Sequence, residues 1–535
     1  MMNNRLFSKY TLIVGVLMSL MPVLGTSCSE DEHQEKATVD WNISGNEIVN
    51  FKPERYKIQK ENPMQGWVIY AGLGDGMMDN FWELYDNFES AEGKVKVSDY
   101  GTTLYIRGAW SQFNPEEGKY IWQDDVDTAP ARRFRMLMKG AKERGLKIAW
   151  TFVTDSRDKH ENFSPEYVRE AGAKYFETTT GSFKGWTPYP DDPIFQEKYG
   201  KFLRDFAAKY DDPEVTQFVS GFGLGKWGET HTLVYSTGDA SPREAVFEWI
   251  TDLMVDAFKR VPIMINYHRC LLNINETADN GLEKSEELID RAVKKGFCLR
   301  HDAFGMKNYY KAWERGIAAK YRYQTPFVME GGWVESSHGN SIKGDGYNNF
   351  AEVRQGEFNE GKGANVNMMD LRFSSNVNTG ETHSWFNTAF NLVKEFIAEG
   401  GYRLYADKIS VPTSANSGRK VSIVHRWSNL GWGYCPTNIP QWNQKYKVCF
   451  ALLDAQEKPV YQFVDDNPQI NEWVKGTPHT YKTDITLSNV AAGKYTWAVG
   501  LVDTQKDNEI GIRISARDEV LTSDGWVKIA DVTVK

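Results

Sequence analysis

Residues 131–153 read Ala131-Arg-Arg-Phe-Arg-Met-Leu-Met-Lys-Gly-Ala-Lys-Glu-Arg-Gly145 and then Leu146-Lys-Ile-Ala-Trp-Thr-Phe-Val153. The first part has apolar residues at helical spacing and ends on a glycine, which suits the position just after a helix. The second part is a short apolar run with the length of a buried strand. A helix followed directly by a buried strand is the repeating unit of parallel α/β folds.

The same alternation recurs over residues 51–403. Short apolar runs there are separated by longer amphipathic segments, and eight runs can be counted: Gly66–Ala71, Thr102–Arg107, Leu146–Val153, Val215–Gly223, Pro262–Tyr267, Phe297–His301, Pro326–Met329 and Ala364–Leu371. Eight parallel strands, each with a helix, close a TIM barrel. The sequence therefore predicts an α/β fold with a (β/α)8 barrel over residues 51–403.

The pattern of residues along the chain changes at about residue 404. From there to residue 535, turns rich in Gly, Asn and Pro separate runs that alternate apolar and polar residues, such as Lys420–His425 and Lys482–Leu487. Alternation of this kind is typical of antiparallel strands with one buried face. We expect residues 404–535 to form a C-terminal antiparallel β-sandwich.

Residues 1–27 have the features of an export signal, with Arg5 and Lys9 ahead of an apolar stretch and small residues before Cys28. The segment Leu24-Gly-Thr-Ser-Cys28 resembles a bacterial lipobox, in which Cys28 would be acylated and would begin the mature chain. The acidic run that follows resembles the surface-export tag of lipoproteins in glycan-degrading Gram-negative bacteria, and a solvated acidic tether over residues 28–50 is compatible with it. This predicts an exported protein at the cell surface, held on the outer membrane only by its N-terminal lipid.

Net charge and the spacing of residues argue against several kinds of ligand. A net charge of −9 argues against nucleic acid. The remaining cysteines lack the spacing of zinc ligands, and no phosphate-binding loop is present, so we expect no metal and no cofactor. Cys435 and Cys449 could form a disulfide in an exported protein or remain buried thiols, and the sequence leaves both open.

Two glutamates stand where predicted strands end. Glu229 follows the apolar run that begins at Gln217, and Glu330 follows Pro326-Phe-Val-Met329. Active sites of β/α barrels lie at the C-terminal ends of the strands. Hydrolysis of a glycosidic bond needs one carboxylic acid to protonate the leaving oxygen and one carboxylate to attack or to activate water. The pair therefore suits a glycosidase.

Other polar and aromatic residues follow the same strand ends. A ring there can stack on a sugar face, and histidines and carboxyls can form a polar wall around a ligand. The candidate substrate-binding residues are Arg107, Trp110, Trp227, His268, His301, Asp302 and Trp333.

Over about residues 60–400 the chain resembles the clan A glycoside hydrolases. The resemblance rests on Arg107 followed by Trp110-Ser-Gln-Phe-Asn-Pro-Glu-Glu-Gly-Lys-Tyr-Ile-Trp122, and on Glu229 and Glu330 at strands four and seven. It implies that Glu229 is the acid/base, that Glu330 is the nucleophile and that an oligosaccharide or polysaccharide is the substrate. Members of the clan usually carry Asn just before the acid/base, whereas this chain has Gly228.

Other interpretations remain at this point. Glu229 could complete a helix cap, and Glu330 could be a buried partner of Arg107, with Glu335 as its substitute in catalysis. A surface lipoprotein that binds glycans without cleaving them would use the same tryptophans, and Gly228 favours that alternative. A lipoprotein whose barrel serves only for docking would lack an open aromatic cleft.

Overall fold

The computed structural model describes residues 39–74, 78–276, 278–306, 309–332, 342 and 346–535. The predicted export signal and Cys28 lie outside the described residues. Within these ranges, no helix is long and apolar enough to cross a membrane.

Eight parallel strands close into a barrel and follow one another around it in chain order. The closing pair joins the last strand to the first, with Met368 opposite Gly66. All eight predicted apolar runs become barrel strands, namely β2 (Gly66–Gly72), β5 (Gly101–Ala109), β6 (Lys147–Val153), β9 (Thr216–Ser220), β10 (Ile263–Asn266), β11 (Cys298–Phe304), β12 (Phe327–Gly331) and β13 (Met368–Asp370). The TIM-barrel prediction is confirmed.

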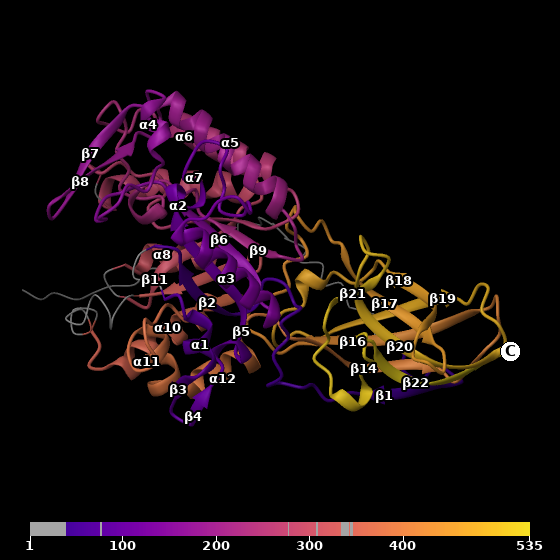
Figure 1. The fold of residues 1–535 in the computed structure, drawn as a ribbon. Coiled ribbons are helices and arrows are strands. Elements are labelled where there is room, and N and C mark those ends of the chain that lie inside the picture. The colour runs from indigo at the N-terminus through magenta and orange to yellow at the C-terminus, as the bar shows by residue number, and fades with distance from the viewer. Residues whose placement is uncertain (1–38, 75–77, 277, 307–308, 333–341, 343–345) are drawn as a thin grey trace, which may run out of the picture. The chain divides into compact units, whose positions relative to one another are not determined.

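Helices occupy the connections between these strands (Figure 1). The described ones are α1 (Phe81–Asp86), α2 (Trp110–Phe113), α3 (Ala129–Glu143), α4 (Glu166–Glu170), α5 (Pro193–Tyr210), α6 (Arg243–Ala257), α7 (Ala278–Lys294), α8 (Ala312–Lys320), α10 (Phe350–Gly363), α11 (Glu381–Thr388) and α12 (Phe390–Glu399). In α3, the Thr128 hydroxyl accepts the Ala131 N–H at 3.2 Å, and Gly145 beyond the other end has φ +66°. This glycine takes the left-handed conformation that its place after a helix predicts.

Two short hairpins lie in barrel connections. Strands β3 (Phe88–Ser90) and β4 (Gly93–Val95) pair after α1, and β7 (Tyr175–Thr180) and β8 (Phe183–Pro188) pair between β6 and β9.

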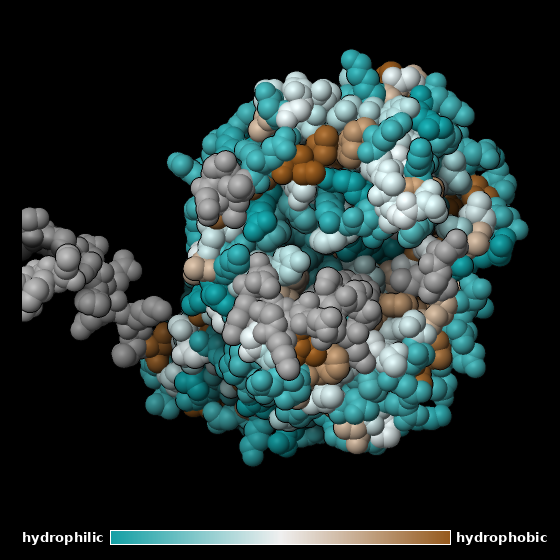
Figure 2. Space-filling view, turned by 90° about the vertical axis from the view of Figure 1, so that its left-hand side faces the viewer, coloured by the Kyte–Doolittle hydropathy of each residue, from teal (hydrophilic) through white to brown (hydrophobic). Residues whose placement is uncertain are grey.

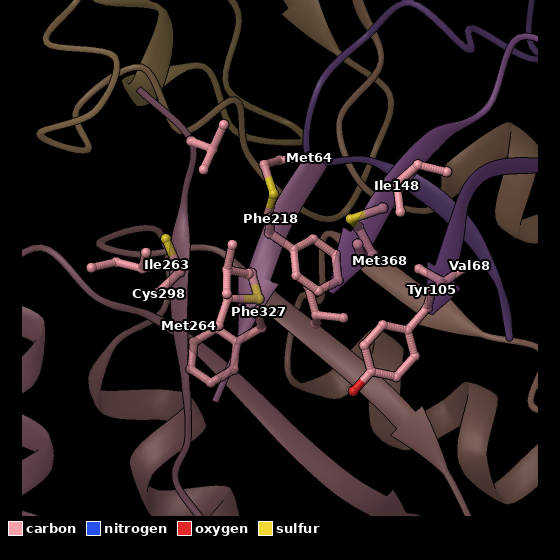
Figure 3. Close-up of a cluster of buried hydrophobic side chains, with 14 of the residues drawn as sticks. Met64, Val68, Tyr105, Ile148, Phe218, Ile263, Met264, Cys298, Phe327 and Met368 are labelled. Atoms are coloured by element: carbon pink, nitrogen blue, oxygen red, sulfur yellow. The ribbon is translucent and has the colours of Figure 1, made fainter. Parts of the chain in front are cut away.

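The barrel strands share one apolar core. Figure 3 shows side chains from every barrel strand packed together, and all of them are buried: Met64, Val68, Tyr105, Ile148, Phe218, Ile263, Met264, Cys298, Phe327 and Met368. Burial of apolar surface on this scale is the main force that holds such a barrel closed.

Residues 404–535 contribute strands to two sheets, and all their pairings are antiparallel except that of the short β15 with β22. One has the order β1 (Asn46–Asn50), β14 (Leu404–Pro412), β16 (Lys420–Asn429), β19 (His479–Thr486). The other has the order β15 (Ser414–Ala415), β22 (Val527–Val534), β20 (Gly493–Asp503), β17 (Tyr446–Leu453), β18 (Pro459–Asp465), with β21 (Glu509–Ile512) beside β20. The antiparallel sheets are confirmed, and their packing as a β-sandwich stays a prediction.

Two details correct or complete the expectations for this region. Residues 46–50, expected to be part of a tether, form strand β1 and pair with β14, because Ile48 and Val49 become half-buried against the sheet. Cys435 and Cys449 are free, buried thiols rather than a disulfide. Cys270 and Cys298 are also free and buried.

Candidate active site

A cavity of about 690 Å³ lies at the C-terminal ends of the barrel strands. Both glutamates line it, together with Arg107, Trp227 and Asp302. Figure 2 shows this face of the molecule hollowed, with hydrophilic residues inside the hollow and a hydrophobic patch on its upper rim. The strand ends therefore surround one cavity that contains several charged side chains, where a barrel active site lies.

Glu330, in β12, is 1% exposed and faces three guanidinium groups. It forms ion pairs with Arg300 of β11 and with Arg372, which follows β13, and its Oε1 lies 3.8 Å from Arg107 Nη1. A carboxylate buried so deeply needs such compensation, because burial disfavours its charged form. These three cations compensate the negative charge that a nucleophilic carboxylate carries.

Glu229 approaches the same guanidinium from the loop after β9. Its Oε1 lies 3.3 Å from Arg107 Nη2, and its Oε2 lies 3.3 Å from His231 Nε2. Burial acts to raise the pKa of Glu229, but His231 and Arg107 lower it to about 2. Arg107 thus bridges the two glutamates.

Asp302, in β11, is a third carboxyl in the cavity. Its Oδ2 accepts a hydrogen bond from Asn266 Nδ2 at 2.6 Å, and its Oδ1 lies 3.2 Å from Arg300 Nε. Burial, and then the charge of Glu229, raise the pKa of Asp302 to about 8. At neutral pH, Glu229 and Asp302 therefore hold one proton between them.

The three carboxyls converge on one another. One oxygen each from Glu229, Asp302 and Glu330 lies within 4.8 Å of the other two. The two glutamates therefore meet across the cavity instead of standing on separate faces of the barrel. Three guanidinium groups surround this set, so its negative charge is already largely compensated.

The backbone before Glu229 explains why a glycine precedes it. Trp227 and Gly228 have φ +59° and +77°, in the left-handed region that favours glycine. A Cβ on Gly228 would lie 3.2 Å from Val153 Cγ2. The tight turn aims the Glu229 carboxyl at the cavity, and asparagine would be strained in this place.

The predicted binding residues divide into three groups. Arg107, Trp227, His268 and Asp302 line the cavity, and Trp227 is half-buried there with Lys226 Nζ 4.3 Å from its ring centroid. Trp333 and Glu335 lie outside the described residues.

Trp110 and His301 do not line the cavity. Trp110 is fully buried, and its ring packs against Tyr167, Phe195, Tyr199 and Phe202. Placing it on the sugar-binding wall was wrong, because helices α4 and α5 cover the strand end there. His301 is also fully buried, behind His268 with 5.0 Å between ring centroids.

Sequence reasoning missed three residues of the site. Arg300 and Arg372 flank Glu330, and His231 contacts Glu229. Arg300 carried a signal, since a charged residue inside the apolar run Phe297–His301 must find a buried partner. For His231 and Arg372, the sequence offered no signal other than their nearness to strand ends.

A second polar cluster lies beside the cavity. One ligand-type atom each from His268, His301 and Glu314 lies within 4.8 Å of the other two. Burial lowers the pKa of both histidines, that of His301 to about 3, so their rings are neutral. Burial acts to raise the pKa of Glu314, but the neighbouring histidine rings and the Lys311 N–H hold it at about 2.

Among solved structures, the chain is similar to several glycosidases at low sequence identity. No family model matches the chain, and no curated protein matches it. It is similar to an exo-β-1,4-mannosidase from an Opitutaceae bacterium, with 11% identity over 59% of this chain and 55% of that chain and a TM-score of 0.34. It is also similar to endo-glycoceramidase II from a Rhodococcus species, with 9% identity over 81% of this chain and all (100%) of that one and a TM-score of 0.36.

A third similar structure is a GH5-4 broad-specificity endoglucanase from an uncultured bacterium, with 11% identity over 65% of this chain, 96% of that chain and a TM-score of 0.38. The assignment of the fold rests on the closed eight-stranded barrel itself. A fold alone does not set a protein's function, which depends on the cavity and its residues.

Proposed function

We propose that the protein is a glycoside hydrolase that cleaves an oligosaccharide or polysaccharide with net retention. The observation that carries the proposal is the convergence of Glu229 and Glu330, with Arg107 between them, on one cavity at the strand ends. Retaining glycosidases have carboxyl groups about 5–5.5 Å apart, and inverting ones about 6.5–9.5 Å. One oxygen of each glutamate lies within 4.8 Å of the other, a nearest approach that is compatible with the shorter, retaining separation.

In the first step, Glu330 attacks the anomeric carbon and the bond from that carbon to the leaving oxygen breaks. The proton that Glu229 and Asp302 share passes from Glu229 to the leaving oxygen when it lies on Glu229, as the glycosyl ester of Glu330 forms. Arg107, Arg300 and Arg372 hold the Glu330 carboxylate charged and oriented for this attack. Trp227 and His268 contribute an aromatic and a polar surface for the sugar.

In the second step, water adds to the anomeric carbon while Glu229 accepts its proton. The ester breaks, and Glu330 leaves as a carboxylate. No cofactor takes part in this scheme, since two carboxyl groups and water supply every atom and proton that moves. Asp302 is the second candidate for the proton donor, because it faces the same cavity within 4.8 Å of Glu229.

Leaving-group chemistry tests the two roles. Glu330→Gln should abolish turnover of natural glycans and of activated aryl glycosides, because every substrate needs the nucleophile. Glu229→Gln should nearly stop natural substrates and spare the glycosylation step with an activated aryl glycoside, whose leaving group needs no proton. Azide should then restore turnover of Glu229→Gln by replacing the base-assisted water.

The same assay includes Asp302→Asn and a melting temperature for each variant as a check on folding. If azide rescues Asp302→Asn and not Glu229→Gln, Asp302 is the acid/base. If the wild-type protein binds glycans from a broad panel and releases no reducing ends, it is a binding protein and the hydrolase proposal fails.

We further propose that the protein is exported and lipid-anchored at the outer surface of the cell through Cys28. The lipobox-like segment and the acidic run after it support this proposal. Cys28→Ala should move the protein from the membrane fraction to the soluble fraction, because each buried CH₂ of the lost acyl chains contributes about 0.8 kcal/mol of anchoring. Unchanged membrane association of Cys28→Ala on fractionation would contradict the anchor.

For residues 404–535 we propose that the two sheets pack face to face as a β-sandwich. Support comes from contacts between them: the rings of His425 in β16 and Phe450 in β17 are 5.0 Å apart, and Trp497 Nε1 in β20 donates to Pro412 O in β14 at 3.0 Å. A sandwich buries the apolar face of each sheet, as the alternating sequence pattern requires.

A further inference from the structure

Three buried ligand-type side chains meet beside the cavity, outside the catalytic carboxyls. His268 follows β10, His301 belongs to β11 and Glu314 belongs to α8. Their exposed fractions are 7%, 0% and 4%. One nitrogen or oxygen atom from each lies within 4.8 Å of the other two.

Among the residues that the structure describes, two nitrogens of this cluster have no hydrogen-bond partner. They are His268 Nδ1 and His301 Nε2, and both are buried. His268 Nδ1 lies 3.4 Å from Glu314 Oε1, in an orientation that does not make a hydrogen bond. Buried polar atoms are almost always satisfied in folded proteins, so two unpartnered nitrogens in a cluster with a carboxylate need a physical reason.

Two other polar atoms of the cluster are held by backbone groups. His301 Nδ1 contacts the Asp302 carbonyl oxygen, which makes Nδ1 the protonated nitrogen and leaves the lone pair on Nε2. Glu314 Oε2 accepts the Lys311 N–H at 2.9 Å, which leaves Oε1 toward the histidines. Histidine and carboxylate ligands of metal ions are commonly oriented by such outer hydrogen bonds.

We propose that His268 Nδ1, His301 Nε2 and Glu314 Oε1 bind one zinc ion. Two imidazole nitrogens and a carboxylate oxygen are a donor set that suits zinc. Tetrahedral zinc with bonds of about 2.0–2.1 Å places its ligand atoms roughly 3.4 Å apart. The separation of His268 Nδ1 and Glu314 Oε1 is 3.4 Å, so this pair already has the spacing of two zinc ligands.

The catalytic carboxyls are the alternative place for a cation. Glu229, Asp302 and Glu330 satisfy the same distance criterion. They are already paired with Arg107, Arg300 and Arg372, whose charges repel a metal ion. In the part of the chain that the structure describes, Glu314 has no ion pair with lysine or arginine, so its charge is left for a metal.

A zinc ion in this place would tie β10, β11 and α8 together behind one wall of the cavity. Three protein ligands leave a fourth coordination position. His268 also lines the cavity, which gives the ion and a water molecule a route to the site. The ion would thus fix the position of His268 toward the cavity.

Metal binding to the full chain tests the proposal without any activity assay. Protein stripped with a chelator is titrated with Zn²⁺ by calorimetry and with Co²⁺ by visible absorption, which reports tetrahedral coordination. We expect one ion per chain and a higher melting temperature with the ion. Glu314→Gln, which retains an acceptor for the Lys311 N–H, and His301→Gln should each lower the affinity by more than about 100-fold.

Two control variants locate the site. Glu229→Gln changes the other carboxyl cluster, and His383→Gln changes a histidine of α11 far along the chain, so both should bind the ion as the wild type does. Absence of one-to-one binding in the folded wild-type protein would overturn the proposal. So would binding that survives Glu314→Gln unchanged, or that is lost in Glu229→Gln. None of these results depends on whether the protein hydrolyses glycans.

Discussion

At the scale of single residues, the site depends on how charge is compensated in a buried place. Glu330 is buried with Arg300 and Arg372 in direct ion pairs, and Arg107 reaches both glutamates. Removing one partner of such a set leaves an uncompensated charge, which is costly. The position of Glu229 depends instead on backbone conformation, through the positive φ of Gly228.

Gly228→Ala should therefore lower activity much more than stability. The left-handed conformation costs a non-glycine residue about 1–2 kcal/mol, and the new Cβ would press on Val153 at 3.2 Å. A displacement of Glu229 by about 1 Å can reduce turnover by on the order of 100-fold. The measurement is kcat on the best substrate found, beside the melting temperature.

Gly238→Ala is the matched control, because Gly238 has φ +80° and nothing lies within 4 Å of its Cβ position. Gly238→Ala carries the same cost of a left-handed conformation as Gly228→Ala, and it should keep wild-type turnover. Equal losses of kcat in both variants would mean that strain alone, and not the placement of Glu229, explains the effect.

At the scale of elements, helix α5 shows how local sequence and packing act together. Asp192 caps it by accepting the Ile194 and Phe195 N–H groups at 2.9 Å each, and Pro193 occupies the first turn. The helix then presents aromatic residues, including Tyr199, to the buried Trp110. This packing is the reason that Trp110 is part of the core and not of the cavity wall.

Asp192→Ala should destabilise the fold modestly. Loss of the cap costs about 1 kcal/mol, which for a chain of this size is a fall in melting temperature on the order of 1–2 °C. Asp192→Asn should keep the cap through its amide oxygen but lose the bond from the Lys174 N–H to Oδ2, at 3.1 Å, so its melting temperature should lie between those of the wild type and Asp192→Ala. A melting temperature for Asp192→Asn as low as that for Asp192→Ala would show that the cap itself contributes little.

At the scale of the whole molecule, a buried polar link joins the two C-terminal sheets. His425 Nδ1 accepts the Trp427 indole N–H at 2.8 Å, so the proton of the neutral ring is on Nε2, which lies 3.2 Å from Asp465 Oδ2. Burial lowers the pKa of His425 despite this carboxylate. Burial acts to raise the pKa of Asp465, but His425 and Thr483 lower it.

This link should make stability fall on acidification. Both folded-state pKa values lie below those of an unfolded chain, about 6.5 for His and 3.9 for Asp, so the unfolded state takes up protons first as the pH falls. The stability that this link contributes is present above about pH 7 and is lost progressively as the pH falls below that value. Melting temperatures between pH 7.5 and 5 should therefore drop less steeply for His425→Gln, which keeps a donor toward Asp465 and cannot titrate. Parallel profiles for the two proteins would contradict this role of His425.

The sequence by itself determined the number and order of the barrel strands, the change of architecture near residue 404 and the two glutamates at strand ends. These features are local, because each can be recognised from consecutive residues. They are an apolar run of strand length, a helical period and a glycine after a helix. The eight predicted runs correspond to β2, β5, β6, β9, β10, β11, β12 and β13, and β14 begins at Leu404.

Only the tertiary structure decided which of these residues face the cavity and which face the core. A tryptophan at a strand end has the same local pattern in both cases, and helices far along the chain bury Trp110 while Trp227 remains at the cavity. The partners of Glu330 come from neighbouring strands, and β1 pairs with a strand more than 350 residues away. Contacts of that kind are fixed by closure of the barrel and pairing of the sheets, and no window of consecutive residues contains them.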